Sequence, residues 1–167
     1  EQEGTYPLPE AQLDRFMFNI RIDYPALEEE LEVVHRTTGA PGDGVDTVMT
    51  GEEVLEFQRL VRGVPVADNV VEYAVRLTRL TRSRTEDAHP QAREFLSWGA
   101  GPRAAQYLVL GAKARAALDG RPTPSVDDVR AVALPVLRHR LVTNFHAEAE
   151  GVTTDDLIRE LVAAAGD

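Results

Sequence analysis

The segment from Ser97 to Ala104 combines three features that together can bind an anion. A glycine-rich turn (Gly-Ala-Gly) leads into Pro102 at the first position of an expected helix, and Arg103 follows at the second. The first turn of a helix carries unpaired backbone N–H groups and the positive end of the helix dipole, and here a guanidinium joins them. Gly101, Pro102 and Arg103 are therefore candidate phosphate ligands. The structural alternative is that Gly101 only caps the helix and Arg103 pairs with a surface acid.

Arg15 is the second candidate, because it stands between two expected elements. Pro9 to Asp14 predicts the first turns of a short helix that ends near Arg15. Residues 16–23 then alternate, with Phe and Ile on the more apolar side, which predicts a strand. An arginine at the edge of a sheet can pair with a neighbouring group, or it can reach across a subunit boundary to a phosphate. The residues alone leave both possibilities open.

Other kinds of chemistry find little support. The four histidines (His35, His89, His139 and His146) have no spacing that places two of them on one helix face, so no metal site is expected. No Gly-x-Ser-x-Gly sequence is present, and the chain has no cysteine, which excludes disulfides and thiol catalysis. The absence of cysteine fits a reducing, cytoplasmic location.

The composition bounds the partners. The 167 residues carry 18 basic and 28 acidic side chains, a formal net charge of −10. That charge argues against nucleic acid as the main partner, although Arg76, Arg79 and Arg82 could form a local basic stripe. No stretch is apolar for long enough to span a membrane.

The elements expected along the chain make it mainly α. A helix, a strand over 16–23 and a second helix occupy residues 1–38, and a glycine-rich linker without periodicity occupies 39–50. Residues 51–167 predict helices only. Helix starts are indicated by Thr50 with Glu53, by Pro102, by Ser125 with Asp128 and by Thr153 with Asp156. The expected fold is a small helical bundle preceded by a helix-strand-helix element.

Three segments resemble the MoxR-type AAA+ ATPases. Residues 1–16 (Glu-Gln-Glu-Gly-Thr-Tyr-Pro-Leu-Pro-Glu-Ala-Gln-Leu-Asp-Arg-Phe) are similar to the family segment after the sensor 1 strand. Residues 99–104 (Gly-Ala-Gly-Pro-Arg-Ala) resemble the sensor 2 motif, with Gly101 where the family more usually has serine. Residues 136–141 (Val-Leu-Arg-His-Arg-Leu) resemble the end of the lid domain. The segments occur in the family's order and span nearly the whole chain.

The resemblance implies a role for each candidate. Arg15 matches the arginine finger, which reaches the γ-phosphate of ATP in the neighbouring subunit of a ring, and Arg103 matches the sensor 2 arginine, which touches nucleotide phosphates. Residues 1–38 would be the end of the α/β ATPase core and 51–167 the helical lid domain. The parent would be a hexameric ATPase that uses ATP and Mg²⁺ for chaperone-like remodelling or metal-cofactor insertion, with von Willebrand factor A domain proteins as partners.

The chain lacks the other half of such a site. No Gly-x-x-x-x-Gly-Lys-Ser/Thr loop is present, because the only lysine is Lys113, and no apolar strand ends in Asp-Glu. We therefore expect this chain alone to bind no cofactor and to hydrolyse no ATP. The alternative from a different class is an independent helical adaptor that binds a protein partner without nucleotide chemistry. With its sheet neighbours missing, the strand over 16–23 is expected to be disordered, repacked on the bundle or paired with another copy.

Overall fold

The computed structural model describes residues 8–40 and 44–166. The chain divides by its contacts into two units, one formed by residues 1–19 and 59–167 and the other by residues 20–58. This division groups residues by their contacts and does not define evolutionary domains. The domain limits predicted at residues 38 and 51 therefore stay a prediction.

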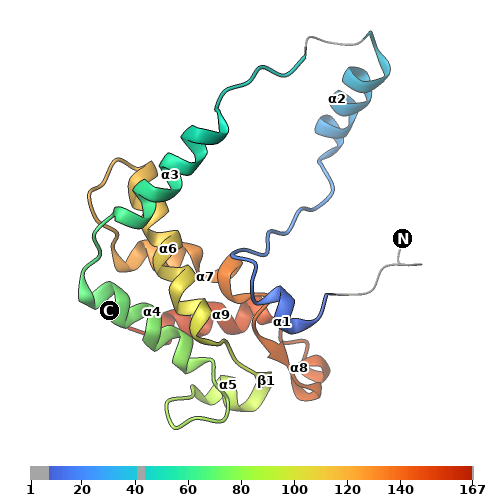
Figure 1. Ribbon diagram of the computed structural model, residues 1–167. Helices are drawn as coiled ribbons and strands as arrows, with labels where there is room; N and C mark the ends of the chain where they lie inside the picture. The colour runs from blue at the N-terminus through green and yellow to red at the C-terminus, as the bar shows by residue number, and fades with distance from the viewer. Residues whose placement is uncertain (1–7, 41–43, 167) are drawn as a thin grey trace. The chain divides into compact units, whose positions relative to one another are not determined.

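Four helices form the core of the larger unit (Figure 1): α4 (Asp68–Leu80), α6 (Pro102–Leu118), α7 (Val126–Leu137) and α9 (Thr154–Ala164). Helix α6 packs mainly against α7 and α4, and α9 packs against α7 and α4. The largest fully buried apolar side chains come from all four helices and are Tyr73, Leu77, Leu108, Val129, Val136, Leu137, Leu157, Ile158 and Leu161. The predicted helical bundle is therefore confirmed.

Small residues let α6 approach α7 closely. Ala104, Ala112 and Ala116 have no exposed surface, and a Cβ built on Gly111 would lie 3.2 Å from a methyl group of Val132. Because interiors are close-packed, glycine at this position fits the space that the valine leaves. The small residues of α6 thus allow close contact with α7.

Polar residues begin the helices where the sequence indicates. At α9 the N–H of Asp156 donates to Thr153 Oγ1 over 3.2 Å, and the N–H of Thr153 donates back to Asp156 Oδ2 over 3.2 Å. At α7 the N–H of Ser125 donates to Asp128 Oδ2 over 2.8 Å. Each contact satisfies a donor that the first helical turn leaves unpaired.

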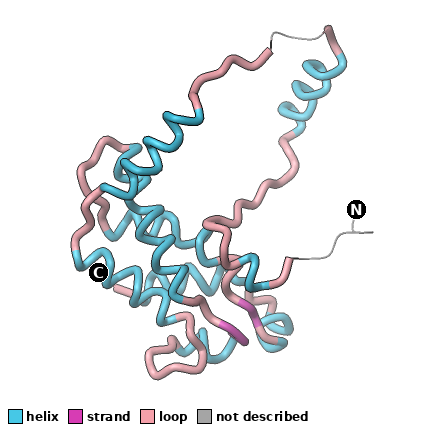
Figure 2. Tube along the Cα trace, viewed as in Figure 1, coloured by secondary structure: helices cyan, strands magenta, loops and turns pink. Residues whose placement is uncertain are grey.

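The prediction of helices only beyond residue 51 is wrong in one region. Two short helices, α5 (Pro90–Phe95) and α8 (Phe145–Glu150), flank the strands β1 (Leu96–Trp98) and β2 (Val142–Thr143). The strands pair antiparallel, with Leu96 opposite Thr143 and Trp98 opposite Val142 (Figure 2). Elements this short carry too few residues to show a period. The pair matters because it fixes the chain just before α6 beside the chain just after α7.

The strand predicted over residues 16–23 is also not found. Helix α1 covers Glu10–Leu13, a turn follows to residue 17, and residues 18–26 adopt no regular secondary structure. A strand needs a partner for its ladder of hydrogen bonds, and β1 and β2 pair only with each other in the described part of the chain. Residues 14–19 instead lie on the bundle, where the N–H of Asn19 donates to the carbonyl of Pro135 over 2.8 Å. Repacking on the bundle was one of the expected outcomes.

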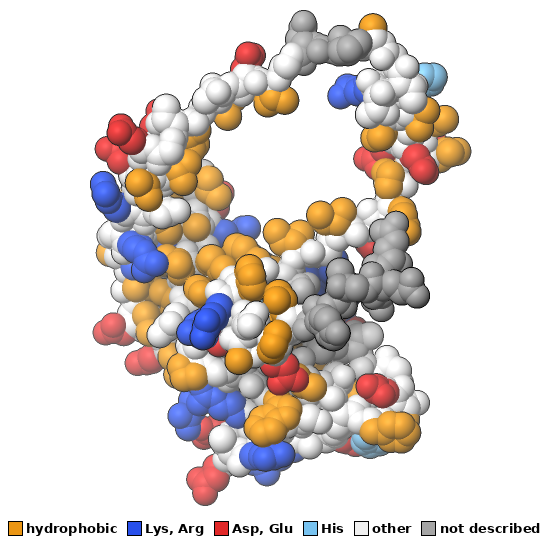
Figure 3. All heavy atoms as spheres, turned by 45° about the vertical axis from the view of Figure 1, so that its right-hand side comes forward, with side chains coloured by type: hydrophobic (Ala, Val, Ile, Leu, Met, Phe, Trp, Pro, Cys, Tyr) orange, Lys and Arg blue, Asp and Glu red, His pale blue; other side chains and the backbone are white. Residues whose placement is uncertain are grey.

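The smaller unit contains α2 (Leu27–Thr38) and most of α3 (Gly51–Gly63). Both helices keep apolar side chains in solvent, and Figure 3 shows them along α2 beside its acidic residues. The predicted cap of α3 is confirmed, since Thr50 and Glu53 exchange hydrogen bonds of 2.7 Å and 3.2 Å. No helix in the described residues is long and apolar enough to cross a membrane.

Candidate functional site

The predicted anion-binding turn lies between β1 and α6. Gly101 is the N-cap of α6 in extended conformation (φ −78°, ψ 178°), Pro102 is the first residue of the helix and Arg103 the second. No side chain forms a capping hydrogen bond at this helix start. The predicted local geometry is confirmed, while phosphate binding stays a prediction.

The turn is held in place by the end of α4. A Cβ on Gly99 would lie 2.1 Å from the carbonyl oxygen of Thr81, so only glycine fits this approach. The N–H of Ala100 donates to Thr81 Oγ1 over 2.9 Å, and Arg82 Nε donates to the carbonyl of Ala100 over 3.2 Å. Thr81 has no exposed surface. The position of Arg103 is therefore set by backbone contacts with α4.

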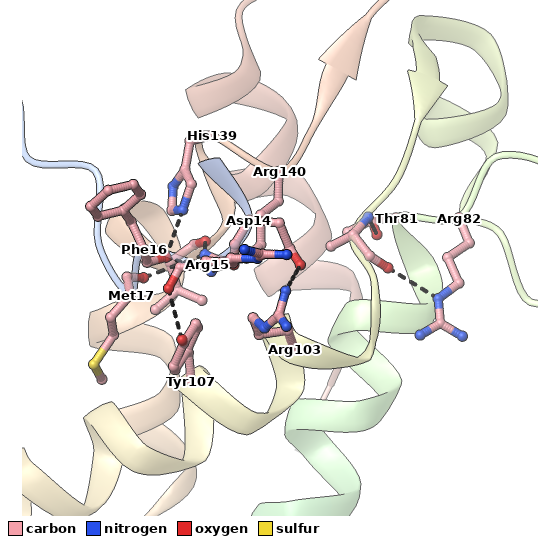
Figure 4. Close-up of polar contacts among 12 residues, drawn as sticks. Asp14, Arg15, Phe16, Met17, Thr81, Arg82, Arg103, Tyr107, His139 and Arg140 are labelled. Carbon is pink, nitrogen blue, oxygen red and sulfur yellow. Dashed lines mark hydrogen bonds and ion pairs between the residues drawn. The ribbon is translucent and has the colours of Figure 1, made fainter. Parts of the chain in front are cut away.

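Arg103 points at Asp14 (Figure 4). Its Nη1 donates to Asp14 Oδ2 over 2.5 Å, and 41% of the Arg103 side chain is exposed. This ion pair joins the predicted sensor arginine to the residue directly before Arg15. An acid partner is what the structural alternative for Arg103 predicts, and an exposed pair of this kind is weak enough for a phosphate to replace the carboxylate.

Arg140 holds the other oxygen of the same carboxylate. Its Nε donates to Asp14 Oδ1 over 3.0 Å, and its Nη2 donates to the carbonyls of Asp14 (2.8 Å) and Phe16 (2.6 Å). Only 1% of the Arg140 side chain is exposed. Burial lowers the pKa of this guanidinium from its ordinary value, and its contacts with Asp14 oppose that effect. A charge this deep is tolerated because every side of it meets an acceptor.

The two residues before Arg140 also bind this segment. Arg138 Nη1 donates to the carbonyl of Asn19 over 3.0 Å, and its Nε and Nη2 hold Asp155 over 2.7 Å and 2.9 Å. His139 Nε2 lies 3.0 Å from the carbonyl of Phe16, and burial lowers the pKa of the imidazole, which favours the neutral form that donates there. We call residues 138–140 the clamp.

Arg15 contacts the bundle through its backbone. Its backbone carbonyl accepts a hydrogen bond from the Tyr107 hydroxyl over 2.9 Å, and the residue is exposed. Its guanidinium makes no hydrogen bond or ion pair with any residue that the structure describes. The backbone of Arg15 is thus held on the bundle, and the residue is exposed.

A cavity of about 200 Å³ lies beside the clamp and the turn before α6. Its wall includes Asp14, Gly101, His139 and Arg140. This volume is below the roughly 300 Å³ at which pockets for small molecules begin, so it suits a single anionic group better than a whole nucleotide. A larger cleft of about 610 Å³ runs between α4 and α6 past Val75 and Leu110. It contains none of the predicted site residues.

The described residues offer no cluster of three or more His, Asp or Glu side chains that could hold a metal ion. Two acids, Glu10 and Asp14, line the cavity, and Asp14 already accepts from two arginines.

Sequence reasoning singled out Gly101, Pro102, Arg103 and Arg15, whose roles stay predictions, but it did not indicate the contacts of Asp14, Tyr107 and Arg140. Residues 136–141 had been singled out only as a point of resemblance. Asp14 and Arg140 are separated by 126 residues, and no spacing in a sequence shows that two such residues touch.

Comparison with known proteins gives the family. A model of the AAA lid domain matches residues 89–161. The Bacillus subtilis protein YeaC is 36% identical over 98% of this chain and 49% of its own length, and the chaperone MoxR1 of Mycobacterium tuberculosis is 35% identical over 97% of this chain and 43% of its own. A crystal structure from Cytophaga hutchinsonii that is assigned as an ATPase covers 98% of the chain at 36% identity, with a TM-score of 0.88.

The chain belongs to the MoxR family of AAA+ proteins. It contains the AAA lid domain and spans about half the length of the curated relatives it matches. The resemblance seen in the sequence is thereby confirmed. The lid match begins at His89 and covers the turn with Arg103 and the whole clamp, but not Arg15.

Proposed function

We propose that this chain supplies Arg15 as an arginine finger and Arg103 as a sensor 2 residue to a MoxR-type ATPase. The observation that carries the proposal is the placement of Arg103. It stands at a helix start without a side-chain cap, half-exposed, and its partner Asp14 lines a small cavity together with Gly101. A guanidinium and the positive end of the helix dipole both favour a phosphate oxygen there.

The two arginines would act at different places. Arg103 would contact a nucleotide phosphate and sense its presence. Arg15, which is exposed, would stabilise the charge that develops on the γ-phosphate in a neighbouring subunit. Such fingers are worth on the order of 10³ to 10⁵ in kcat.

The chain by itself would not hydrolyse ATP. Its only lysine, Lys113, lies in the middle of α6 and donates to the carbonyl of Arg62 over 3.2 Å, so it is not part of a phosphate-binding loop. ATP and Mg²⁺ would be held by other parts of the parent, and the Mg²⁺ would bridge and neutralise the phosphates.

The setting of this activity follows the family. We propose a hexameric ring in the cytoplasm, von Willebrand factor A domain proteins as partners, and remodelling of client proteins or insertion of metal cofactors as the outcome of hydrolysis. A relative named as a chaperone supports the remodelling part.

The test is ATP hydrolysis by the full-length protein beside this chain alone. Arg15→Ala and Arg103→Ala should each lower ATP turnover by the full-length protein, and Arg15→Ala should lower it by at least about 10³-fold. This chain alone should show no turnover. Arg159→Ala is the matched control, because Arg159 is also exposed and also pairs with an aspartate, Asp156, over 2.9 Å. Full turnover by Arg15→Ala would remove the finger assignment, and full turnover by Arg103→Ala would remove the sensor assignment.

The adaptor alternative has one observation in its favour. The cleft between α4 and α6 is lined largely by apolar side chains, including Val71, Val75 and Val109. If the protein is an adaptor, its Arg103→Glu variant should bind the partner almost as tightly as the unchanged protein does. A full-length protein that forms rings and still shows no turnover would favour this function over the ATPase.

A further inference from the structure

We propose that Asp14 and Arg140 position the Arg15 finger and connect it to Arg103, so that nucleotide contact at Arg103 is transmitted to the base of the finger. This proposal rests on the proposed function. Arg140 and Asp14 are positioning residues, since neither would touch the ATP in the neighbouring subunit on which Arg15 acts.

The first step is the hold on the backbone around Arg15. The carbonyls of residues 14, 15, 16, 17 and 19 all accept hydrogen bonds from the bundle, namely from the clamp and the Tyr107 hydroxyl. Regular secondary structure normally consumes such carbonyls. Here side chains of the bundle take its place, so the position of the finger's base depends on the bundle.

The second step is the difference between the two arginines that share Asp14. Arg140 is 1% exposed in its side chain and also donates to the carbonyls of Asp14, Phe16, Met17 and Val136. Arg103 is 41% exposed, and its bond to Asp14 is the contact described for its guanidinium. Removing Arg140 would leave buried acceptors unpaired, whereas Arg103 can leave Asp14 for water or a phosphate.

The third step is what happens when Arg103 leaves. Asp14 keeps Arg140 on its other oxygen, so its carboxylate is not left without a partner. The carboxylate loses one of its two ion pairs, and Asp14 is covalently joined to Arg15. The occupancy of Arg103 is therefore felt one residue from the finger, which gives a route from a subunit's own nucleotide to its neighbour's site.

Asp14→Asn in the full-length protein tests this. Asparagine keeps the size of the side chain and an oxygen for Arg140, but it removes the charge that holds Arg103. A reacting group displaced by about 1 Å can lose roughly 10²-fold in rate, so kcat should fall by about 10- to 100-fold with KM for ATP unchanged or lower. Arg140→Gln should lower kcat by a similar factor.

Asp128→Asn is the matched control. Asp128 also forms ion pairs with two arginines, with Arg121 at 2.6 Å and Arg115 at 3.5 Å, and it is more buried than Asp14. It lies outside the cavity and the clamp. Measured at a temperature where every variant is folded, its kcat should equal that of the unchanged protein. An Asp14→Asn kcat equal to the control's would overturn the proposal, even if Arg140→Gln failed to fold.

Mixed rings separate positioning from a general structural defect. Subunits with Asp14→Asn are mixed with subunits that have an intact Asp14 and Arg15 but lack the lysine of their own phosphate-binding loop. Turnover should return in these mixed rings, and also in mixed rings made with Arg15→Ala subunits. The subunits without the lysine supply an intact Arg15 to the nucleotide sites of the variant subunits. No return with Asp14→Asn but return with Arg15→Ala would overturn the proposal alone. Unreduced turnover by Arg15→Ala before mixing would instead overturn the finger assignment on which it rests.

Discussion

Gly99→Ala tests whether the close approach of Gly99 to the end of α4 holds the turn before Arg103 in place. The new Cβ would lie 2.1 Å, 2.5 Å and 2.8 Å from three backbone atoms of Thr81 and Arg82. Backbone atoms cannot rotate away as the end of a side chain can, so the turn itself must move. Gly99 is not in the left-handed region, so the cost is a clash and not a forbidden dihedral angle.

The size of the effect follows from the distances. Ordinary van der Waals contact begins at 3.4 Å, so the turn must retreat by roughly 1.3 Å from the Thr81 oxygen. That movement breaks the 2.9 Å bond from the Ala100 N–H to Thr81 Oγ1 and leaves a buried donor unpaired, at a cost of about 1–3 kcal/mol. Overpacking adds about 1–3 kcal/mol. We expect the free energy of unfolding to fall by about 4 kcal/mol.

Urea unfolding followed by circular dichroism measures this. With an m-value of about 1.5 kcal/mol/M, the midpoint should fall by about 2.5 M. The control is Gly101→Ser, two residues along the same turn, where an added Cβ meets nothing within 4 Å. Serine is a good N-cap, so this variant should be unchanged or more stable by a few tenths of a kcal/mol. A Gly99→Ala midpoint within 0.3 M or so of the control's would refute the steric argument.

Three further predictions concern the bundle. The pKa of His139 is lowered by burial below its unfolded value of about 6.5, so the unfolded chain protonates first, and stability should fall as pH drops below about 6.5; His139→Gln should flatten that part of a plot of midpoint against pH. Asp128→Ala leaves Arg121 without its buried partner and should cost about 3–5 kcal/mol in urea unfolding, with Asp119→Ala, at the exposed end of the same arginine, costing less than about 1 kcal/mol. Leu108→Ala opens a cavity at a fully buried site in α6 and should lower the free energy of unfolding by about 2–5 kcal/mol, and with it the melting temperature. An unchanged melting temperature would contradict the packing described for α6.

The long helices could be predicted because their signals are local. Proline at the start of α6 and the capping residues of α7 and α9 act within one helical turn, and each helix begins within a residue of the predicted start. The turn with Gly101 and Arg103 could be placed for the same reason. Local contacts are the ones that spacing in a sequence describes.

The strand over residues 16–23 could not be decided in this way. Its alternation is real, but a strand forms only when another strand supplies its hydrogen bonds. The carbonyls of this segment are taken up instead by Arg138, His139 and Arg140. The same pattern in the sequence is therefore compatible with a strand where sheet neighbours are present and with a docked irregular segment where the bundle supplies the donors.

The clamp shows what kind of signal does reach from the sequence to a long-range contact. Leu137 and Leu141 are both buried, and the three polar residues between them form the turn that follows α7. Two buried leucines four residues apart pull that turn onto the bundle, so the polar side chains between them cannot all reach water. Arg140, next to Leu141, must then find acceptors inside the protein, and carbonyls that no backbone N–H occupies, or a carboxylate, can serve. Asp14 and the carbonyls after α1 are such acceptors, and their place beside Arg15 is what gives a structural arginine a route to function.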